Sequence, residues 1–285
     1  MPDKARQAMN TLLGEPGNLT FGTLLRHWRG ARRLTQLRLA CEAGISARHL
    51  SFLETGRARP SREMVQLLAE MLDVPLSERN ALLVGAGYAP VFGERPLSAP
   101  ELAHVRRALE YTLRQQEPYP ALVMNAYHDI VLRNEASRRI FEMFRGPLPD
   151  GITINGIRTI FDPRGIRPFI VNWDEMAECA MRGLQREIAE TGNDALVRLR
   201  DQVLAYPDVP TYFAALNALD ADTPLVNMHL RKGDVSLKFF SAMTFIGRAR
   251  DITLQNLKIE FFFPADEATE HFSRRLATIP STVAV

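Results

Sequence analysis

The sequence predicts two domains, an all-α bundle of short helices followed by an α+β domain built on an antiparallel sheet. A length of 285 residues exceeds the usual size of one domain. Capped helical patterns fill the N-terminal third, and strand-like alternation begins only after residue 120. We expect the first domain over residues 1–92 with its core at about 20–75, a linker over 93–104, and the second domain over 105–285.

Positive charge is concentrated in the first domain, although the whole chain carries a formal net charge of only +2. Residues 20–62 contain nine arginines and two acids, so their net charge is 9 − 2 = +7 and the remainder carries 2 − 7 = −5. A basic segment joined to a mildly acidic body suits a surface that contacts nucleic acid. The alternative interpretation is a solvated arginine-rich face that binds nothing.

Two helices are expected before the first glycine turn of this domain. The apolar residues that recur at three- and four-residue intervals are Phe21, Leu24, Leu25 and Trp28. They mark one face of a helix that ends near Arg33. Thr35 offers a hydroxyl N-cap to a second helix, and Gly44 supplies the left-handed residue favoured at its end.

A third helix is expected to begin after the N-cap Ser46 and to run to about Thr55. Leu50 and Leu53 fall on one side of a helical wheel. The opposite side carries Ala47, Arg48, Ser51, Phe52 and Thr55. A short helix of this kind can enter the DNA major groove, where a guanidinium pairs bidentately with guanine.

Gly56 and the basic pair Arg57 and Arg59 lead from this helix to a fourth one, which starts at Pro60 and Ser61. Its apolar residues are Met64, Leu67, Leu68, Met71 and Leu72. A fifth helix is expected within residues 77–92, capped by Ser77. The glycines at 85 and 87 lack both the spacing and the preceding strand of a nucleotide-binding loop.

Residues 20–75 resemble the Xre-type helix-turn-helix family of phage-repressor-like regulators. The resemblance rests on Leu34-Thr35-Gln36, on the turn Ala43-Gly44-Ile45-Ser46, and on Leu50, Ser51, Leu53, Glu54, Gly56, Pro60 and Ser61. It implies that Gln36 contacts a phosphate and that Glu54 orients an arginine. It also implies that the early recognition-helix residues read bases, namely Ala47, Arg48 and Ser51.

The predicted DNA contacts are Thr35, Gln36, Ser46, Ala47, Arg48, Ser51, Phe52, Arg57 and Arg59. Phe52 departs from the polar residue typical of its position, and either touches a thymine methyl group or packs on side chains of its own domain. The implied partner is double-stranded DNA. A two-fold homodimer would read an inverted repeat whose half-sites lie about 10 base pairs, or a multiple of that, apart.

The second domain mixes helical and strand patterns. After the linker sequence GERPLSAP we expect helices over residues 101–116, 135–144, 173–190 and 193–206, and strands over 121–124, 130–132, 235–245 and 257–263. In the last two strands the apolar residues alternate with polar ones and are Val235, Leu237, Phe239, Met243, Phe245, Leu257, Ile259, Phe261 and Phe263. Alternation predicts a sheet with one apolar face, covered by core helices alone or by helices and a ligand.

Residues 105–265 resemble the PAS-related ligand-binding domain of MmyB-like regulators. The resemblance rests on four phrases in family order, EPYPALVMNAYHDIVLRNEAS, IFDPRG, NWDEMAE and HLRKGDV. It predicts a PAS-like α+β sensor. Two departures concern the pocket, because Leu230 follows His229 where proline is common, and Asn217 stands near the position of a family tryptophan.

An elongated apolar effector such as a fatty acid suits the apolar β positions, with Arg133, His229 or Arg231 as partners for a carboxylate head group. The candidate ligand residues are Phe141, Phe144, Phe161, Trp173, His229, Arg231, Phe239, Met243, Phe245 and Phe261. The aromatic residues among them are equally explained as ordinary core. No cofactor is required. The alternative is that this domain serves only for dimerisation or partner binding.

Other functional classes find little support in the sequence. The six histidines lie apart, and HExxH, GxSxG and P-loop motifs are missing, so we do not expect an enzyme or a metal site. Cys41 and Cys179 are expected to be buried reduced thiols. No signal peptide or membrane-crossing apolar run is present, which predicts a cytoplasmic protein without membrane contact.

Overall fold

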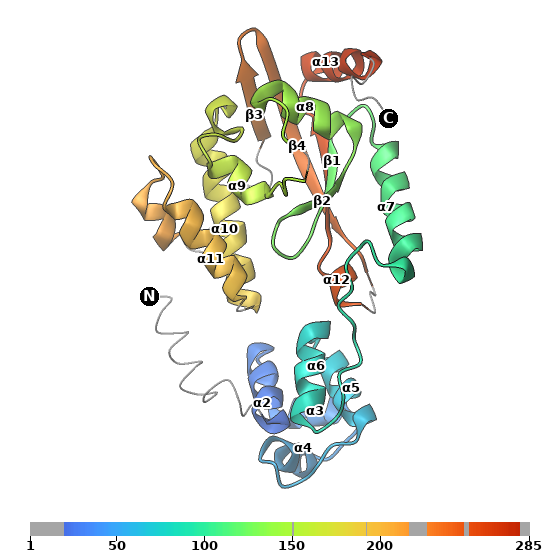
Figure 1. Ribbon diagram of the computed structural model, residues 1–285. Helices are drawn as coiled ribbons and strands as arrows, with labels where there is room; N and C mark the ends of the chain where they lie inside the picture. Colours follow the sequence, from blue (N-terminus) through green and yellow to red (C-terminus); the bar gives the residue numbers. More distant parts are fainter. Residues whose placement is uncertain (1–19, 150, 192, 217–226, 248–250, 280–285) are drawn as a thin grey trace. The chain divides into compact units, whose positions relative to one another are not determined.

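The computed structural model describes residues 20–149, 151–191, 193–216, 227–247 and 251–279. The chain divides into two compact units (Figure 1). The first unit comprises Met1–Arg95 and Arg248–Gln255, and the second comprises Pro96–Gly247 and Asn256–Val285. The division after Arg95 falls within residues 93–104. The sequence gives no sign that a short segment far along the chain joins the first unit.

The first unit is a helical bundle. Its elements are α2 (Phe21–Ala31), α3 (Gln36–Glu42), α4 (Ala47–Glu54), α5 (Arg62–Met71), α6 (Leu76–Gly85) and α12 (Ile252–Gln255). The predicted N-caps Thr35 and Ser46 are confirmed, because each hydroxyl accepts a hydrogen bond from the backbone N–H three residues later. Ser61, expected at the start of the fourth helix, caps α5 in the same way. The expectation for α6 was wrong, since Pro75 is its N-cap and Ser77 lies inside the helix.

Close packing of α2 on α4 holds the first unit together. Gly22 is buried, and a Cβ atom added there would lie 2.5 Å from the carbonyl oxygen of Glu54. Gly44 and Gly56 have φ angles of +65° and +72°, as expected of the residues that end α3 and α4. On α5, Leu67 is 40% exposed, while Val65 is 1% exposed and belongs to the core.

The second unit contains a five-stranded antiparallel sheet in the order β2-β1-β5-β4-β3. The strands are β1 (Ala121–Met124), β2 (Ile130–Arg133), β3 (Asn227–Lys232), β4 (Val235–Phe245) and β5 (Lys258–Pro264). The α-helices are α7 (Ala103–Gln115), α8 (Glu135–Arg145), α9 (Gly156–Phe161), α10 (Trp173–Thr191), α11 (Asp194–Leu204) and α13 (Glu267–Thr278). Short 3-10 helices span Pro100–Leu102, Arg167–Phe169 and Thr211–Ala215. This confirms the predicted α+β class.

Helices cover both faces of the sheet, with α7 on one side and α10 on the other (Figure 1). The prediction of a single apolar face was therefore wrong. Phe239 pairs with Pro264, and Phe261 pairs with Ala242, so Phe239 and Phe261 point to opposite faces. We call the face that carries Leu237 and Phe239 the inner face, and the face that carries Phe261 the outer face.

Four further expectations about burial were wrong. Met243 and Phe245 are 46% and 59% exposed rather than turned into the core. Pairing between β3 and β4 stops at Phe240, so β3 does not flank this last part of β4. Cys41 and Cys179 are both exposed free thiols rather than buried ones.

Candidate DNA interface and ligand-binding face

The fold exposes one side of α4 as predicted. Leu50 and Leu53 are buried against the core of the first unit, while Arg48 is exposed and Ser51 and Phe52 are half-buried. Ala47 packs partly against the same core. Thr35 and Ser46 are exposed at the starts of α3 and α4, where their hydroxyl oxygens cap the helices. The outward side of α4 therefore presents a guanidinium and a hydroxyl, the groups that read base edges in a major groove.

A buried carboxylate fixes α4 in place. Glu54 is 4% exposed and accepts hydrogen bonds from Arg29 Nε at 2.6 Å and from Gln36 Nε2 at 2.8 Å. Burial alone would raise the pKa of Glu54, but the hydrogen bonds from Arg29 and Gln36 outweigh it and the pKa is lowered. The arginine that Glu54 orients is thus Arg29. The side-chain amide of Gln36 has two hydrogens, and the one that Glu54 accepts holds α3 to α4.

Phe52 lies beneath two arginines. The guanidinium carbons of Arg48 and Arg57 lie 5.3 and 6.0 Å from the centre of its ring. Such stacking restricts two flexible side chains before any DNA is bound. Of the two roles left open for Phe52, the geometry favours packing on side chains of its own domain.

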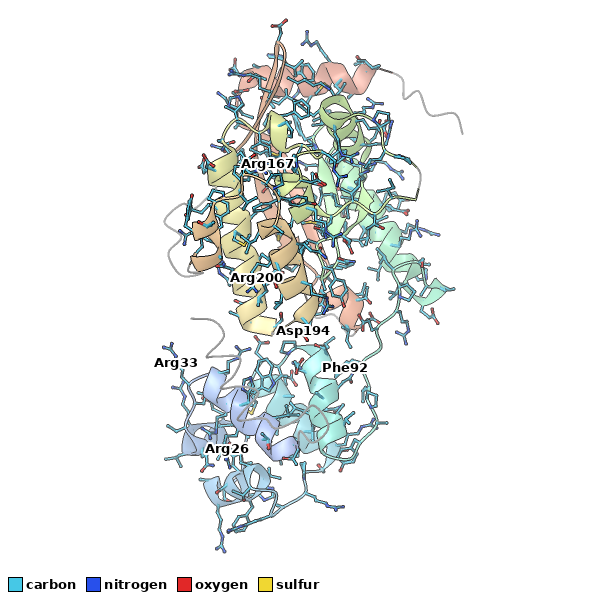
Figure 2. The ribbon with its side chains drawn as sticks, turned by 60° about the vertical axis from the view of Figure 1, so that its left-hand side comes forward. Arg26, Arg33, Phe92, Arg167, Asp194 and Arg200 are labelled. Atoms are coloured by element: carbon cyan, nitrogen blue, oxygen red, sulfur yellow. The ribbon has the colours of Figure 1, made fainter. Side chains whose placement is uncertain are left out.

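The basic segment separates into structural and outward arginines. Arg29 belongs to the Glu54 network, and Arg32 donates hydrogen bonds to the carbonyl oxygens of Leu72 and Asp73, which end α5. Arg33 extends outward from the first unit (Figure 2). Arg26 is exposed as well, but it also belongs to the Glu54 network, because its Nε lies 3.5 Å from Glu54 Oε2. Arg48, Arg57 and Arg59 are also exposed. The charge available to a phosphate backbone is therefore smaller than the arginine count suggests.

The candidate ligand residues do not form one site. Phe144, Phe161 and Phe239 are at most 1% exposed and belong to the cores around the inner face and the α9–α11 helices. Trp173 donates its indole N–H to the carbonyl oxygen of Ile160 and stacks on Phe213. These four side chains act as core, because their contacts are satisfied within the domain.

His229, Arg231 and Phe261 lie on the outer face. His229 Nε2 lies 2.9 Å from Ser236 Oγ, and its pKa is lowered by burial, Lys238 and Arg231. Register places Lys238 opposite His229, and Arg231 is exposed. None of these three residues can share a pocket with Phe239 through the sheet.

The inner face instead carries a buried charged cluster, which the alternation of apolar and polar residues in the sequence does not predict. Lys258 Nζ lies 2.5 Å from Glu187 Oε2 on α10, and His128 Nε2 lies 3.0 Å from the same oxygen. Lys258 and His128 are 8% and 6% exposed. Burial would raise the pKa of Glu187, but hydrogen bonds from His128 and Lys258 outweigh it and lower the pKa. This cluster ties the sheet to α10.

Two more ionisable groups on the inner face are poorly paired. Leu122 pairs with Arg133 on one side and with Glu260 on the other, so all three point to this face. Burial raises the pKa of Glu260, whose hydrogen-bonding neighbour is the Ser241 hydroxyl. Burial lowers the pKa of Arg133, which stacks on Phe141 and has no hydrogen-bonding or ion-pair partner among the described residues. Desolvated, unpaired charges are typical of functional sites.

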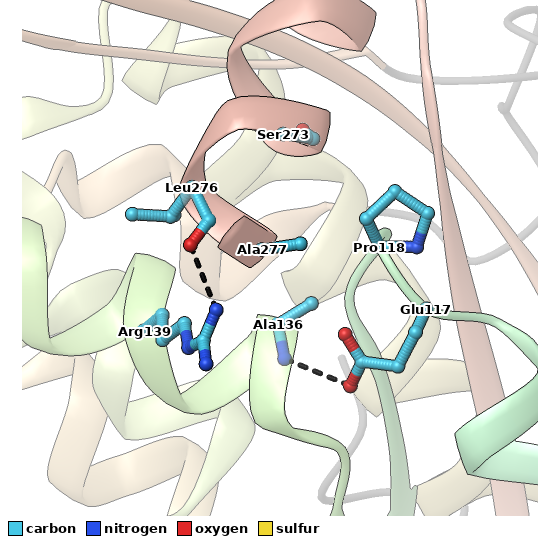
Figure 3. A pocket seen from close by; sticks show the side chains of 7 residues that line it. All are labelled: Glu117, Pro118, Ala136, Arg139, Ser273, Leu276 and Ala277. Carbon is cyan, nitrogen blue, oxygen red and sulfur yellow. Dashed lines mark hydrogen bonds between the residues drawn. The ribbon is translucent and has the colours of Figure 1, made fainter. Parts of the chain in front are cut away.

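Two hollows border this domain. Figure 3 shows a crevice in which Arg139 donates to the carbonyl oxygen of Leu276 and Glu117 accepts from the backbone N–H of Ala136. The crevice leaves no room for a water molecule, although it lies beside the buried, unpartnered hydroxyl of Ser273. An open hollow of about 130 Å³ is lined by Phe141, Arg145, Leu148 and Arg158, among others. Of the predicted ligand residues, Phe141 alone lines either hollow.

The sequence offered one signal for the inner-face charges. The run Phe261-Phe262-Phe263 does not alternate, which is typical of a strand buried on both faces. In such a strand the flanking Lys258 and Glu260 must be partly buried as well. Among the described residues, the structure brings no group of three or more acidic, histidine or cysteine side chains into a metal-binding arrangement. No helix in that part of the chain is long and apolar enough to cross a membrane.

Comparison with known proteins bears on both units. Residues 105–276 match the MmyB-like transcription regulator ligand binding domain, and residues 20–82 match a helix-turn-helix domain. Over 82 residues, or 28% of its length, the chain is 38% identical to the uncharacterized HTH-type transcriptional regulator RghRB of Bacillus subtilis (strain 168). The matched region covers 57% of that relative, so the chain spans little more than half of its length.

Proposed function

Since the chain belongs to the transcription regulators with an MmyB-like ligand-binding domain behind a helix-turn-helix domain, we propose that α4 reads an operator under the control of a small amphiphile. The outward side of α4 is the observation that best supports the proposed DNA binding. There Arg48 is exposed over Phe52, while Glu54 anchors the helix from beneath. We further propose a cytoplasmic homodimer that recognises an inverted repeat.

The proposed DNA contacts divide into two kinds. Arg48 and Ser51, with Ala47, face base edges, whereas Gln36 and Arg57 contact phosphates. Thr35, Ser46, Phe52 and Arg59 border the same surface. A base contact specifies sequence, and a phosphate contact adds affinity without sequence preference.

Selection of binding sites from random DNA with the full chain tests this division. Arg48→Ala should weaken binding to the selected operator by about 1 to 3 kcal/mol and relax the preference at one base pair. Arg57→Ala and Gln36→Ala should weaken all sequences alike, and Arg57→Ala should reduce the salt dependence. Arg106→Ala, which removes an exposed charge on α7, is the control and should change nothing. Equal losses on every sequence for Arg48→Ala would contradict its assigned role.

For the effector we propose an elongated apolar molecule with an anionic head group, such as a fatty acid. Arg133 supports the anionic group, because its guanidinium is half-buried on the inner face and unpaired among the described residues. Glu260 adds a carboxyl group that burial keeps protonated more readily than usual, and a protonated carboxyl can donate a hydrogen bond. The apolar part would lie along Phe141, Phe262 and Met243, which are not fully buried.

Organic extraction and mass spectrometry of the purified protein test for a resident lipid. Titration with decanoate tests the head group, and Arg133→Met should weaken decanoate binding about tenfold because a charge-assisted hydrogen bond is lost. Arg231→Met, on the outer face, is the matched control. Loss of binding in both variants alike, or no binding by the wild-type chain, would argue against this effector.

The exposure of Met243 and Phe245 favours a second candidate, in which the domain serves only for dimerisation or partner binding. In that case extraction yields no lipid, and a Met243→Ser, Phe245→Ser double variant dissociates the dimer. Sedimentation of the double variant separates the two candidates, because an effector site predicts an unchanged oligomeric state.

A further inference from the structure

The connection between β4 and β5 contains a short element that belongs to the other unit. Residues 239–245 of β4 pair with the whole of β5. The chain between them includes α12, and residues Arg248–Gln255 group with the helix-turn-helix unit. We call residues 251–255 the docking segment. A strand pair of the ligand-binding domain is thus joined, through a few residues of chain, to a part of the DNA-binding unit.

Polar contacts hold the docking segment at the end of the first unit. Asp251 is 4% exposed and lies 3.1 Å from Arg95 Nη1. The backbone N–H of Ile252 donates to the carbonyl oxygen of Gly93 at 2.9 Å, and the Thr253 hydroxyl donates to that of Arg95 at 2.6 Å. A buried carboxylate with a charged partner makes this attachment specific.

The docking segment also completes α6. The N-cap of α6 is Pro75, which makes no side-chain cap hydrogen bond. The backbone N–H of Leu76, at the start of the helix, donates instead to Gln255 Oε1 at 2.8 Å. Helix N-terminal N–H groups have no partner within the helix, so a side chain from elsewhere must satisfy them or water must. Here the cap comes from a residue 179 positions along the chain.

We propose that the docking segment is the positioning element through which the strand pair β4–β5 acts on the DNA-binding unit. The inner-face ends of this pair carry Phe245 and Lys258, and the next residues on that face are Met243 and Glu260. In this proposal, a change at these positions acts on residues 251–255 through the chain that joins them to the strands, and the contacts of Asp251, Thr253 and Gln255 lie in the first unit. α6 packs on α2, and α2 packs on α4, so the attachment reaches the proposed recognition helix through two helix contacts.

This inference rests on the proposed function, because it assigns an effect on DNA affinity. Coupling between two sites requires an element with two states, and the ligand of each site must bind one of these states more tightly than the other. The docked and undocked states of residues 251–255 supply such an element. An effector that binds one state more tightly shifts DNA affinity without touching α4.

The experiment compares the full chain with Gln255→Ala and Asp251→Asn, and uses Gln202→Ala as a matched control. Gln202 also accepts a hydrogen bond through its side chain, from Arg158, but within the second unit. Amide hydrogen exchange at Leu76 and affinity for the selected operator are measured for each protein. Gln255→Ala should speed exchange at Leu76 about fivefold, since one hydrogen bond is lost. Both docking variants should change operator affinity at least about threefold in the same direction, with base preference unchanged.

Two results would overturn the proposal. Unchanged exchange at Leu76 in Gln255→Ala would show that the cap does not exist in solution. Faster exchange with unchanged operator affinity would show that the segment only supports α6. If the wild-type chain selected no DNA at all, the proposed function would fail, and the exchange measurement would still report on the docking contact. Asp251→Asn, which keeps the side-chain shape, guards against misfolding of the alanine variant.

Discussion

Two glutamates, Glu54 and Glu260, show how differently the two units use charge. Glu54 accepts hydrogen bonds from Arg29 and Gln36, and its pKa is lowered despite burial. Glu260 has the Ser241 hydroxyl as its hydrogen-bonding neighbour, and its pKa is raised. A carboxylate with several partners stabilises a fold, whereas one without a charged partner costs free energy when it ionises.

The difference assigns different tasks to the two units. The proposed recognition helix α4 has to keep one orientation, and the hydrogen bonds of Glu54 to Arg29 and Gln36 hold it to α2 and α3. Under the proposed function, an effector would complete the interactions of poorly paired groups such as Arg133 and Glu260.

The largest expected effect on stability comes from removing the Glu54 carboxylate, whose hydrogen bonds are all within the first unit. Glu54→Ala should lower the free energy of unfolding of the first unit by about 3 to 5 kcal/mol, because Arg29 and Gln36 lose a buried acceptor. Trp28 lies in the first unit and Trp173 in the second, so denaturation followed by Trp28 fluorescence in a Trp173→Phe background isolates the first unit. Glu42→Ala breaks only an exposed pair with Arg38 and should cost less than about 0.5 kcal/mol. Similar losses in both variants would mean that burial of Glu54 contributes nothing.

A smaller effect concerns the close approach that brings Glu54 to its partners. Gly22→Ala should destabilise the first unit by about 1 to 3 kcal/mol, because the new methyl group meets the backbone of Leu53 and Glu54. Gly30→Ala, on the same helix, meets no atom within 4 Å and should instead stabilise by about 0.5 to 1 kcal/mol through helix propensity. Equal effects of the two substitutions, measured by the same Trp28 unfolding assay, would refute the close contact.

Local patterns predicted the first four helices of the first unit, α2 to α5, but not the N-cap of α6 or the segment Arg248–Gln255. Caps such as Thr35 and Ser46 and turn glycines such as Gly44 act within a few residues, so the sequence around them carries the whole signal. The contact of Gly22 with Glu54 and the cap of Leu76 by Gln255 join distant residues, and no local pattern contains them. Family resemblance indicated a role for Glu54, and the structure supplied its partners.

The second unit was predicted in class but not in detail. Alternation shows which residues of one strand share a face, but it does not show which face of β4 coincides with which face of β5. Register decides this, and it put Phe261 opposite to Phe239 and brought Glu260 to the inner face. For the same reason most of the candidate ligand residues proved to be core, outer-face or exposed side chains, whereas Lys258 and Glu187 were overlooked.

The smallest expected effect is on the pH dependence of stability, to which Glu54 and Glu260 contribute with opposite sign. Glu260 has a raised pKa in the folded chain, so the folded state binds more protons and loses stability as pH rises above the ordinary value of 4.5. Glu54 has a lowered pKa, so its contribution is present above 4.5 and is lost as pH falls through the folded value. Glu260→Gln should therefore stay within about 1 kcal/mol of wild type at neutral pH and remove the decline of the second unit with rising pH. Unfolding of the second unit at each pH is followed by Trp173 fluorescence in a Trp28→Phe background. If the pH dependence of stability were unchanged in Glu260→Gln, this carboxyl would ionise as freely as an exposed one.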